Sequence, residues 1–361
     1  MTDAALSPSA AASTDDVDDE LRRMLSERTD RAAAYGPAFV ALWEAASDTL
    51  LGGKMLRPRM LLAAFDALAG ETDAECDRRS VVRIAAAVEV LHFAFLLHDD
   101  VIDGDLQRRG RPNLIGALLG QRAGLRAHDD LHWARTNGLL LGDILLSCAH
   151  QSFAREPLTH DRRIGLLDLL DHTITESVAG EQLDVGLADR VLATELTTVL
   201  DMTRLKTATY TFELPLRAAA ILAGCSGRTE AAIAELARHL GVAFQLQDDM
   251  LSTFGRADEH GKDAYSDLRE GKQTAAIAYA RMTAAWPSIE RHFGSPDLTA
   301  LEGDQLRAQL VACGAEDFVS SLIDDQLRAC VALLADTESG IPRALDPVIG
   351  DILAAIEGRR A

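Results

Sequence analysis

The sequence predicts an all-α fold in a single domain. Alanine and leucine recur at helical spacing from about residue 30 onward, only 10 of the 361 residues are proline, and no segment alternates β-branched with polar residues. The expected breaks between helices are clusters of turn-forming residues, and they fall near positions 52–53, 70, 104–112, 120–130, 156–157, 224–227, 255–271 and 286–296. Because no repeat or long linker separates two halves, we expect ten or more helices in one domain over residues 26–361.

The charge balance is strongly acidic. Acidic residues number 56 against 36 basic ones, which gives a formal net charge of −20. Nucleic-acid binding depends on neutralising phosphates with lysine and arginine, so this balance argues against a nucleic-acid partner. Residues 1–25 are rich in alanine, serine and aspartate, and we expect them to form a disordered acidic tail. An anionic ligand would need a local basic cluster or a bridging metal ion.

The cysteines and the apolar runs indicate a cytoplasmic protein. The five cysteines include no C-x-x-C pair, which argues against a disulfide framework or a zinc site. The longest apolar run, residues 84–97, contains Glu89 and His92 and is shorter than the roughly 20 residues of a membrane span. The beginning of the sequence lacks the basic-then-apolar order of a signal peptide. We therefore expect no membrane span.

The helix expected over residues 81–103 carries a polar stripe on an otherwise apolar surface. Its polar exceptions are Glu89, His92, Asp99 and Asp103, and their spacings of 3, 7 and 4 align them along one side of the helix. Burying such a stripe in an apolar bundle is costly. We therefore expect it to line a polar cavity.

Two carboxylate clusters follow apolar helical segments. Asp99, Asp100 and Asp103 precede a basic R-R-G-R-P turn, and Asp248 and Asp249 lie in a second such segment. Ligation by oxygen atoms alone suits Mg²⁺, which shares phosphate oxygens readily, and paired arginines match the geometry of a phosphate group. Each cluster could also be an ordinary charged helix end. Separate basic residues beside glycines could be solvated surface charges.

Six motifs occur in a fixed order along residues 48–280. They are G-G-K-x-x-R-P, H-D-D-V-I-D with R-R-G-R-P-N, G-E-Q-L-D, L-K-T-A, F-Q-L-Q-D-D, and G-K with D-L-R-E-G-K-Q-T. This series resembles the trans-isoprenyl diphosphate synthases of the polyprenyl synthetase family. The resemblance implies an isoprenoid-synthase-type helical bundle around a deep central cavity, usually a homodimer. It also implies a Mg²⁺-dependent prenyltransferase that condenses isopentenyl diphosphate with an allylic diphosphate, with three ions per active site.

The resemblance implies a role for each matching residue. The implied catalytic residues are Asp99, Asp100, Asp103, Arg108, Lys206 and Asp248, and the implied metal ligands are Asp99, Asp103, Asp248 and Asp249. The residues implied to grip isopentenyl diphosphate are Lys54, Arg57, His92 and Arg109. Those implied to hold the allylic diphosphate are Arg108, Lys206, Thr207, Gln245, Lys262 and Lys272.

The residues before Asp99 bear on the length of the product. The side chain four residues before Asp99 lies about one helical turn below it, and that residue is Phe95, preceded by Ala94. In the family an aromatic residue at either position limits elongation, so the resemblance implies a short product. We expect geranylgeranyl diphosphate, with farnesyl diphosphate as the alternative. Phe95 could equally be an ordinary core residue.

The chain departs from the family pattern at two positions. Ser252 stands where the second motif usually has a third aspartate, and Glu181 stands where a glutamine often follows the glycine.

Three other functions are less consistent with the sequence. A non-catalytic regulatory subunit of the same fold typically loses aspartates or arginines that this chain keeps. A terpene cyclase needs a different second metal motif. A di-iron bundle needs two E-x-x-H motifs, and the chain offers only residues 89–92.

Overall fold

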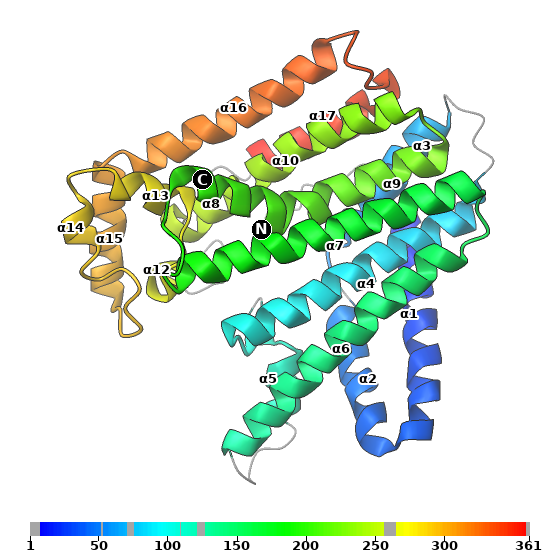
Figure 1. Ribbon diagram of the computed structural model, residues 1–361, viewed down its shortest axis with the longest axis horizontal. Helices are drawn as coiled ribbons and strands as arrows, with labels where there is room; N and C mark the ends of the chain where they lie inside the picture. Colours follow the sequence, from blue (N-terminus) through cyan, green and yellow to red (C-terminus); the bar gives the residue numbers. More distant parts are fainter. Residues whose placement is uncertain are drawn as a thin grey trace. The chain divides into compact units, whose positions relative to one another are not determined.

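The computed structural model of the chain describes residues 8–51, 53–70, 76–108, 110–120, 127–255 and 265–358. These residues are almost entirely helical, which confirms the all-α prediction (Figure 1). They divide into two compact units, here called the N-terminal unit (residues 6–170 and 218–225) and the C-terminal unit (residues 171–217 and 226 onward). Each unit is described by itself below.

The N-terminal unit begins with helices that surround one long central helix. Its elements are α1 (Pro8–Ala32), η1 (Ala33–Tyr35), α2 (Pro37–Leu50), α3 (Leu56–Ala69), α4 (Arg78–Asp103), β1 (Gln107–Arg108), β2 (Arg111–Pro112), α5 (Leu114–Gly120) and α6 (Ala127–Arg155). The first part of α7 (His160–Ala188) and the last part of α9 (Leu214–Ala223) complete the unit. Among the described residues the only strands are β1 and β2, which pair antiparallel with Arg108 opposite Arg111.

The C-terminal unit contains the rest of α7 and α9 and the helices that follow. Its other elements are α8 (Leu196–Thr203), η2 (Arg204–Glu213), α10 (Gly227–Phe254), α12 (Ser266–Glu270), α13 (Ala275–Arg281), α14 (Trp286–Ile289), α15 (Ala300–Ala312), α16 (Ala315–Ala335), η3 (Arg343–Leu345) and α17 (Asp346–Glu357). The segment η2 is a π-helix. Helix α10 packs against η2 and α16.

The single domain that the sequence predicts over residues 26–361 stays a prediction, and the two units are compact groups of the described residues. Two boundaries between the units fall inside helices, after Leu170 in α7 and after Arg217 in α9. Because both helices continue across these boundaries, the sequence has no local signal that marks them. The third boundary, between Cys225 and Ser226, falls in the break between α9 and α10 that the sequence predicts.

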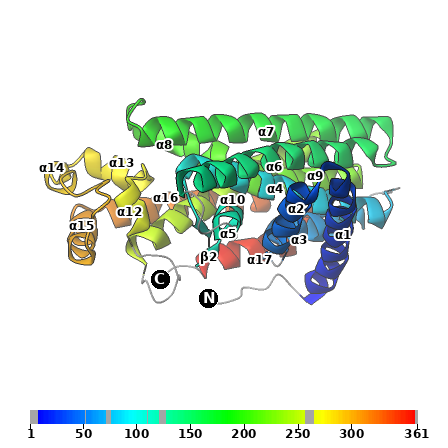
Figure 2. The same cartoon turned by 90° about the horizontal axis from the view of Figure 1, so that it is seen from below.

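Helix α4 forms the core of the N-terminal unit. It packs against α1, α3 and α6, and α1 also packs against α2 and α3 (Figure 2). Ile84, Leu91 and Leu97 are fully or almost fully buried. By length and composition α4 could cross a membrane, but 72% of its apolar window is buried within the protein, as in the core helix of a globular unit.

Helix α1 corrects the prediction of a disordered acidic tail over residues 1–25 for its part from Pro8 onward, and residues 1–7 lie outside the described residues. The chain is helical from Pro8 to Ala32, and Val17, Leu21 and Leu25 are buried. These three residues recur every four positions, so they form one apolar stripe on a helix. The stripe packs against α3 and α4, while the acidic side chains between them occupy the other faces. The acidic composition concealed this amphipathic pattern.

Candidate active site

One side of α4 is less buried than the rest, and it carries three of the four residues of the predicted polar stripe, whereas Glu89 is buried. His92, Phe95 and Asp99 are half-buried and Asp103 is exposed, whereas Ala94 is fully buried. At 100° per residue, Phe95 lies about 40° around the helix from Asp99, and Ala94 lies about 140° from it. Phe95 therefore shares the side of α4 that carries the aspartates. Ala94 faces the packed interior of the unit.

The hairpin after α4 returns Arg108 to the aspartates. Gly104, with φ of 76°, ends α4 directly after Asp103, and β1 then carries Arg108 back along the helix end. The Arg108 guanidinium donates to Asp99 Oδ2 at 2.8 Å and to Asp100 Oδ1 at 2.6 and 3.1 Å. An arginine fork held by two carboxylates is oriented to receive a phosphate group.

The charges in this cluster shift one another's pKa values. Burial raises the pKa of Asp100 above its usual range, although the charge of Arg108 and its hydrogen bonds lower it. Burial lowers the pKa of Arg108, but the carboxylates of Asp100 and Asp99 outweigh this effect and raise it above its ordinary value. The guanidinium therefore remains fully charged in a half-buried position.

A strained turn precedes α3 in the G-G-K-x-x-R-P motif. Met55 adopts the left-handed conformation with φ of 51°, which is unusual for a residue with a side chain, and it is buried. Such strain persists only where the surroundings enforce it, and it gathers at functional sites. The turn leaves Lys54 exposed and Arg57 buried in the first turn of α3. A Cβ atom at Gly53 would lie 3.4 Å from Oε1 of Glu89, so this loop touches the polar stripe of α4.

In the C-terminal unit, Lys206 is held by two carboxylates from α7. Its Nζ lies 2.6 Å from Asp184 Oδ2 and 3.0 Å from Glu181 Oε2. A Cβ atom at Gly180 would lie 2.2 Å from the Lys206 backbone nitrogen, so α7 and η2 are in backbone contact there. The sequence contains Glu181 and Asp184 in the G-E-Q-L-D motif but did not reveal that both bind this lysine. Thr207 follows in η2 and is half-buried.

The second carboxylate cluster lies near the end of α10. Gln245 Nε2 donates to Asp249 Oδ1 at 2.7 Å, one helical turn away. The pKa of Asp249 is raised to about 8, chiefly by burial, with the hydrogen bond from Gln245 lowering it and the charge of Asp248 raising it. Two adjacent carboxyl groups in such surroundings are costly to ionise together, and a bound cation would offset that cost. Ser252, one turn beyond Asp248, adds a hydroxyl group in place of a third carboxylate.

The structure brings only some of the predicted residues into direct contact. In the C-terminal unit, Lys272 Nζ lies 3.6 Å from Asp267 and 3.3 Å from Glu270, so it pairs with acidic residues of its own segment. Arg109 and Lys262 lie outside the described residues. The deep central cavity stays a prediction.

The carboxylates fit a divalent cation that is shared with a ligand. Among the described residues, no group of three histidine, cysteine, aspartate or glutamate side chains could hold a metal ion by itself. Asp99 and Asp103 offer oxygen atoms from one side of α4, and Asp248 and Asp249 offer them from α10. A hard cation bound by so few protein oxygens completes its shell with water and phosphate oxygens. Each pair of carboxylates, taken by itself, therefore fits a cation that enters together with a diphosphate.

These features define an all-α protein with two clusters of carboxylates, one of them bound to a fixed guanidinium, and the chain is similar to known proteins. The family model for polyprenyl synthetase matches residues 40–294. The geranylgeranyl diphosphate synthase of Methanosarcina mazei is 31% identical over 271 residues, which cover 75% of this chain and 76% of that protein. The geranylfarnesyl diphosphate synthase of Aeropyrum pernix is 32% identical over 275 residues, which cover 75% and 79%.

The fold agrees with solved structures. A geranylgeranyl pyrophosphate synthase from Corynebacterium glutamicum, complexed with isoprenyl diphosphate and magnesium, superposes with a TM-score of 0.87 at 28% identity, covering 95% of this chain and 98% of that one. The chain belongs to the polyprenyl synthetase family and is a prenyltransferase of the short-chain trans-isoprenyl diphosphate synthase type.

Proposed function

We propose that the chain is a geranylgeranyl diphosphate synthase. It joins isopentenyl diphosphate to an allylic diphosphate by Mg²⁺-dependent 1′-4 condensation and lengthens the chain to twenty carbons. The observation that supports this proposal most directly is the Arg108 fork, which the hairpin holds against Asp99 and Asp100 at the end of α4. A fixed guanidinium beside oxygen ligands for a cation is what a diphosphate leaving group requires.

We assign roles to residues in both units. Asp99 and Asp103 on α4, and Asp248 and Asp249 on α10, hold Mg²⁺, three ions in all, and Asp100 orients Arg108. The allylic diphosphate is bound by Arg108, Lys206, Thr207, Gln245, Lys262 and Lys272. Isopentenyl diphosphate is bound by Lys54, Arg57, His92 and Arg109.

The residues perform distinct parts of the chemistry. Bound Mg²⁺ supplies Lewis-acid polarisation of the leaving diphosphate. Arg108 and Lys206 stabilise the negative charge that develops on the diphosphate as its C–O bond breaks. The C=C bond of isopentenyl diphosphate then forms the new C–C bond with the allylic cation, and the proton that is lost goes to the released diphosphate. Phe95 keeps water from the cation on the aspartate-bearing side of α4.

We assign the control of product length to Phe95. Its ring lies about one helical turn below Asp99, on the same side of α4, where a growing chain would run away from the diphosphate. An aromatic side chain there favours a short product. Geranylgeranyl diphosphate agrees with the names of the Methanosarcina and Corynebacterium relatives, and farnesyl diphosphate is the alternative. Ala94, on the buried side of α4, is not part of this proposal.

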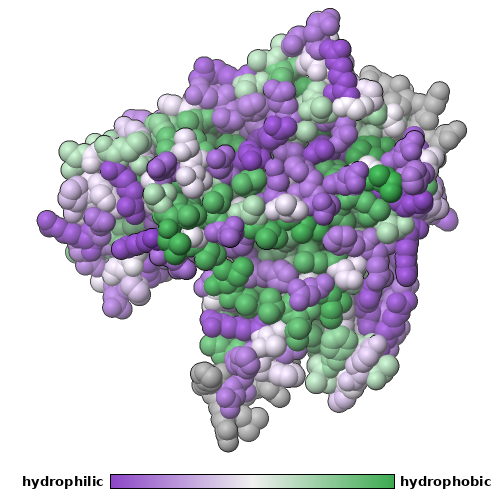
Figure 3. Space-filling view, viewed as in Figure 1, coloured by the Kyte–Doolittle hydropathy of each residue, from purple (hydrophilic) through white to green (hydrophobic). Residues whose placement is uncertain are grey.

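The enzyme is further proposed to be a cytoplasmic homodimer. Trp133, Leu139 and Leu140 of α6 are 40%, 46% and 52% exposed, which is unusual for three large apolar side chains within eight residues. Figure 3 shows apolar surface over this helix. A second copy of the chain would cover it. Light scattering of purified protein should give twice the chain mass, and Leu140→Asp should give the monomer; a monomeric wild-type protein would contradict the proposal.

Product analysis tests the proposed function. Purified protein is incubated with isopentenyl diphosphate and dimethylallyl, geranyl or farnesyl diphosphate, with Mg²⁺ or with EDTA, and the dephosphorylated products are sized. We expect a C20 alcohol that depends on Mg²⁺. A C15 or C25 product would keep the enzyme class and overturn the chain length. The absence of product with every allylic primer would favour a non-catalytic regulatory subunit of the same fold.

Two substitutions sharpen that assay. Asp99→Asn and Asp248→Asn should each remove most of the activity while leaving the helical circular dichroism unchanged. The matched control is Asp143→Asn, since the Asp143 side chain on α6 is 63% exposed and only approaches His98 at 3.4 Å. An equal loss in all three variants would argue against specific roles for the two aspartate clusters.

A further inference from the structure

The segment that carries Lys206 is a π-helix of ten residues, Arg204–Glu213. A π-helix is rare and usually amounts to a single turn, often at a functional site. Glycines on both neighbouring helices admit its wide backbone. A Cβ atom at Gly180 of α7 would lie 2.2 Å from the Lys206 nitrogen, and one at Gly241 of α10 would lie 2.4 Å from the Cβ of Ala208. The packing around η2 is therefore shaped for this unusual conformation.

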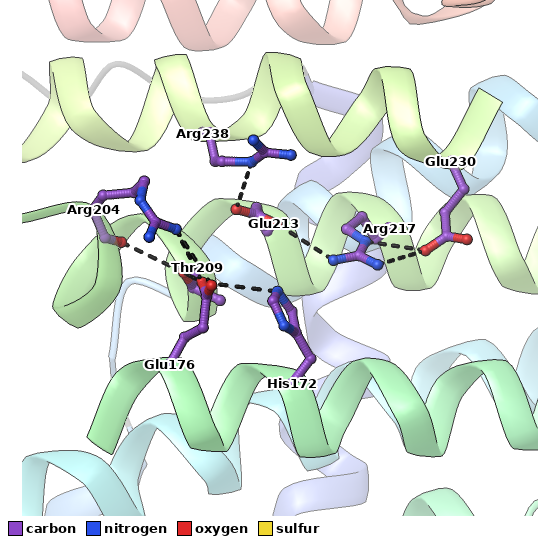
Figure 4. A network of polar contacts seen from close by, with 8 residues as sticks. All are labelled: His172, Glu176, Arg204, Thr209, Glu213, Arg217, Glu230 and Arg238. Carbon is purple, nitrogen blue, oxygen red and sulfur yellow. Dashed lines mark hydrogen bonds and ion pairs between the residues drawn. The ribbon is translucent and has the colours of Figure 1, made fainter. Parts of the chain in front are cut away.

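One carboxylate on α7 ties two positions of η2 together. Glu176 accepts a hydrogen bond from Thr209 Oγ1 at 2.7 Å and from Arg204 Nη1 at 3.3 Å (Figure 4). Burial raises the pKa of Glu176, but the Thr209 hydrogen bond and the Arg204 charge outweigh burial and hold it below the ordinary value. Glu176 is therefore ionised at neutral pH.

The spacing of these two partners depends on the π conformation. Arg204 and Thr209 are five residues apart, so in an α-helix their side chains would lie about 140° apart around the axis. In a π-helix the i and i+5 positions share a face, as the contact from Thr209 Oγ1 to the Arg204 carbonyl at 3.4 Å also shows. The π conformation of η2 therefore places both partners of Glu176 on one face.

The far end of η2 is anchored separately. Glu213 is 1% exposed, and its carboxylate lies 3.3 Å from Arg217 and 3.3 Å from Arg238 of α10. Arg217 in turn donates to Glu230 at 3.0 and 2.8 Å. Both ends of the π-helix are thus fixed by buried or half-buried ion pairs, and Lys206 lies between them.

We infer that Glu176 is a positioning residue that, through Thr209 and Arg204, holds η2 in its π conformation and so presents Lys206 to the allylic diphosphate. The inference rests on the proposed role of Lys206. Within the described part of the chain, Glu176 contacts Thr209, Arg204 and, at 3.7 Å, His172, none of which is assigned to substrate. Its effect is exerted through the backbone of η2, whose return to α-helical hydrogen bonding would turn Lys206 away from Asp184.

The test uses Thr209, because Thr209→Val removes one hydroxyl group and keeps the shape of a fully buried side chain. We expect the KM for the allylic diphosphate to rise about tenfold, since a hydrogen bond to a charged group is lost, while the KM for isopentenyl diphosphate stays within about twofold. Thr209→Ser keeps the hydroxyl group and should restore the wild-type value. Glu176→Ala should behave like Thr209→Val.

The control and the double mutant separate positioning from general stability. Thr203→Val removes another buried hydroxyl group, which bonds to the Val199 carbonyl in α8 and not to Glu176, and it should leave both KM values unchanged. In a Lys206→Ala background, Thr209→Val should have no further effect on the allylic KM. An unchanged allylic KM in Thr209→Val, an equal rise for both substrates, or full additivity with Lys206→Ala would each overturn the inference. A wild-type protein that makes no product would instead overturn the proposed function, and the wild-type assay alone reports that outcome.

Discussion

Arg108 donates to two carboxylates, and one of them, Asp100, has a side chain that is only 3% exposed. Arg108→Ala would leave that carboxylate without its guanidinium partner, so we expect the free energy of unfolding to fall by about 2 kcal/mol. Urea denaturation at neutral pH measures the change. The control is Arg111→Ala, an exposed arginine of the same hairpin, which should change stability by less than about 0.5 kcal/mol. Similar losses in both variants would show that the pairing contributes little.

Phe95 offers a second test at the level of one residue. Phe95→Ala should lengthen the product by one or more isoprene units, because it removes an aromatic ring about one turn below Asp99. Phe93→Leu is the control, since Phe93 is buried and lies about 120° from Asp99 around α4. Product sizing measures both. An unchanged product in Phe95→Ala would mean that the ring is only a packing residue.

At the scale of elements, the contact between α7 and η2 leaves no room for a side chain at Gly180. Gly180→Ala would force the two backbones apart, so we expect a loss of about 1–3 kcal/mol in the free energy of unfolding and a fall in activity. Gly350→Ala is the control, because a Cβ atom at that position of α17 meets nothing within 4 Å. It should stabilise the protein by about 0.5–1 kcal/mol. A neutral Gly180→Ala would mean that η2 can shift without cost.

The helices also show how much of the fold the periodicity of the sequence could predict. Periodicity predicted α4 and its polar stripe, because both depend on residues within one helix. It missed α1, although Val17, Leu21 and Leu25 have helical spacing, since the acidic composition around them indicated a solvated tail. It could not predict the π conformation of η2, which depends on glycines in two other helices and on Glu176.

At the scale of the whole molecule, the fold should survive removal of divalent cations. The described residues contain no metal site made by protein ligands alone, and the cores of both units are apolar. We therefore expect EDTA to abolish product formation while the melting temperature stays unchanged. Circular dichroism and the product assay, run on one sample, measure both. Unfolding in EDTA would show that a cation is part of the fold, and activity in EDTA would exclude the proposed metal dependence.

The sequence by itself determined the helical class, the order of the six motifs and the family to which they belong. Each of these is a property of composition or of spacing along the chain. The tertiary structure alone decided that Arg108 folds back onto Asp99 and Asp100, and that Lys206 rests on Glu181 and Asp184. It also decided the division into two units. Arg108 reaches its partners through a turn of the chain, and Lys206 meets Asp184, 22 residues away, only when helices pack. No local periodicity records either contact.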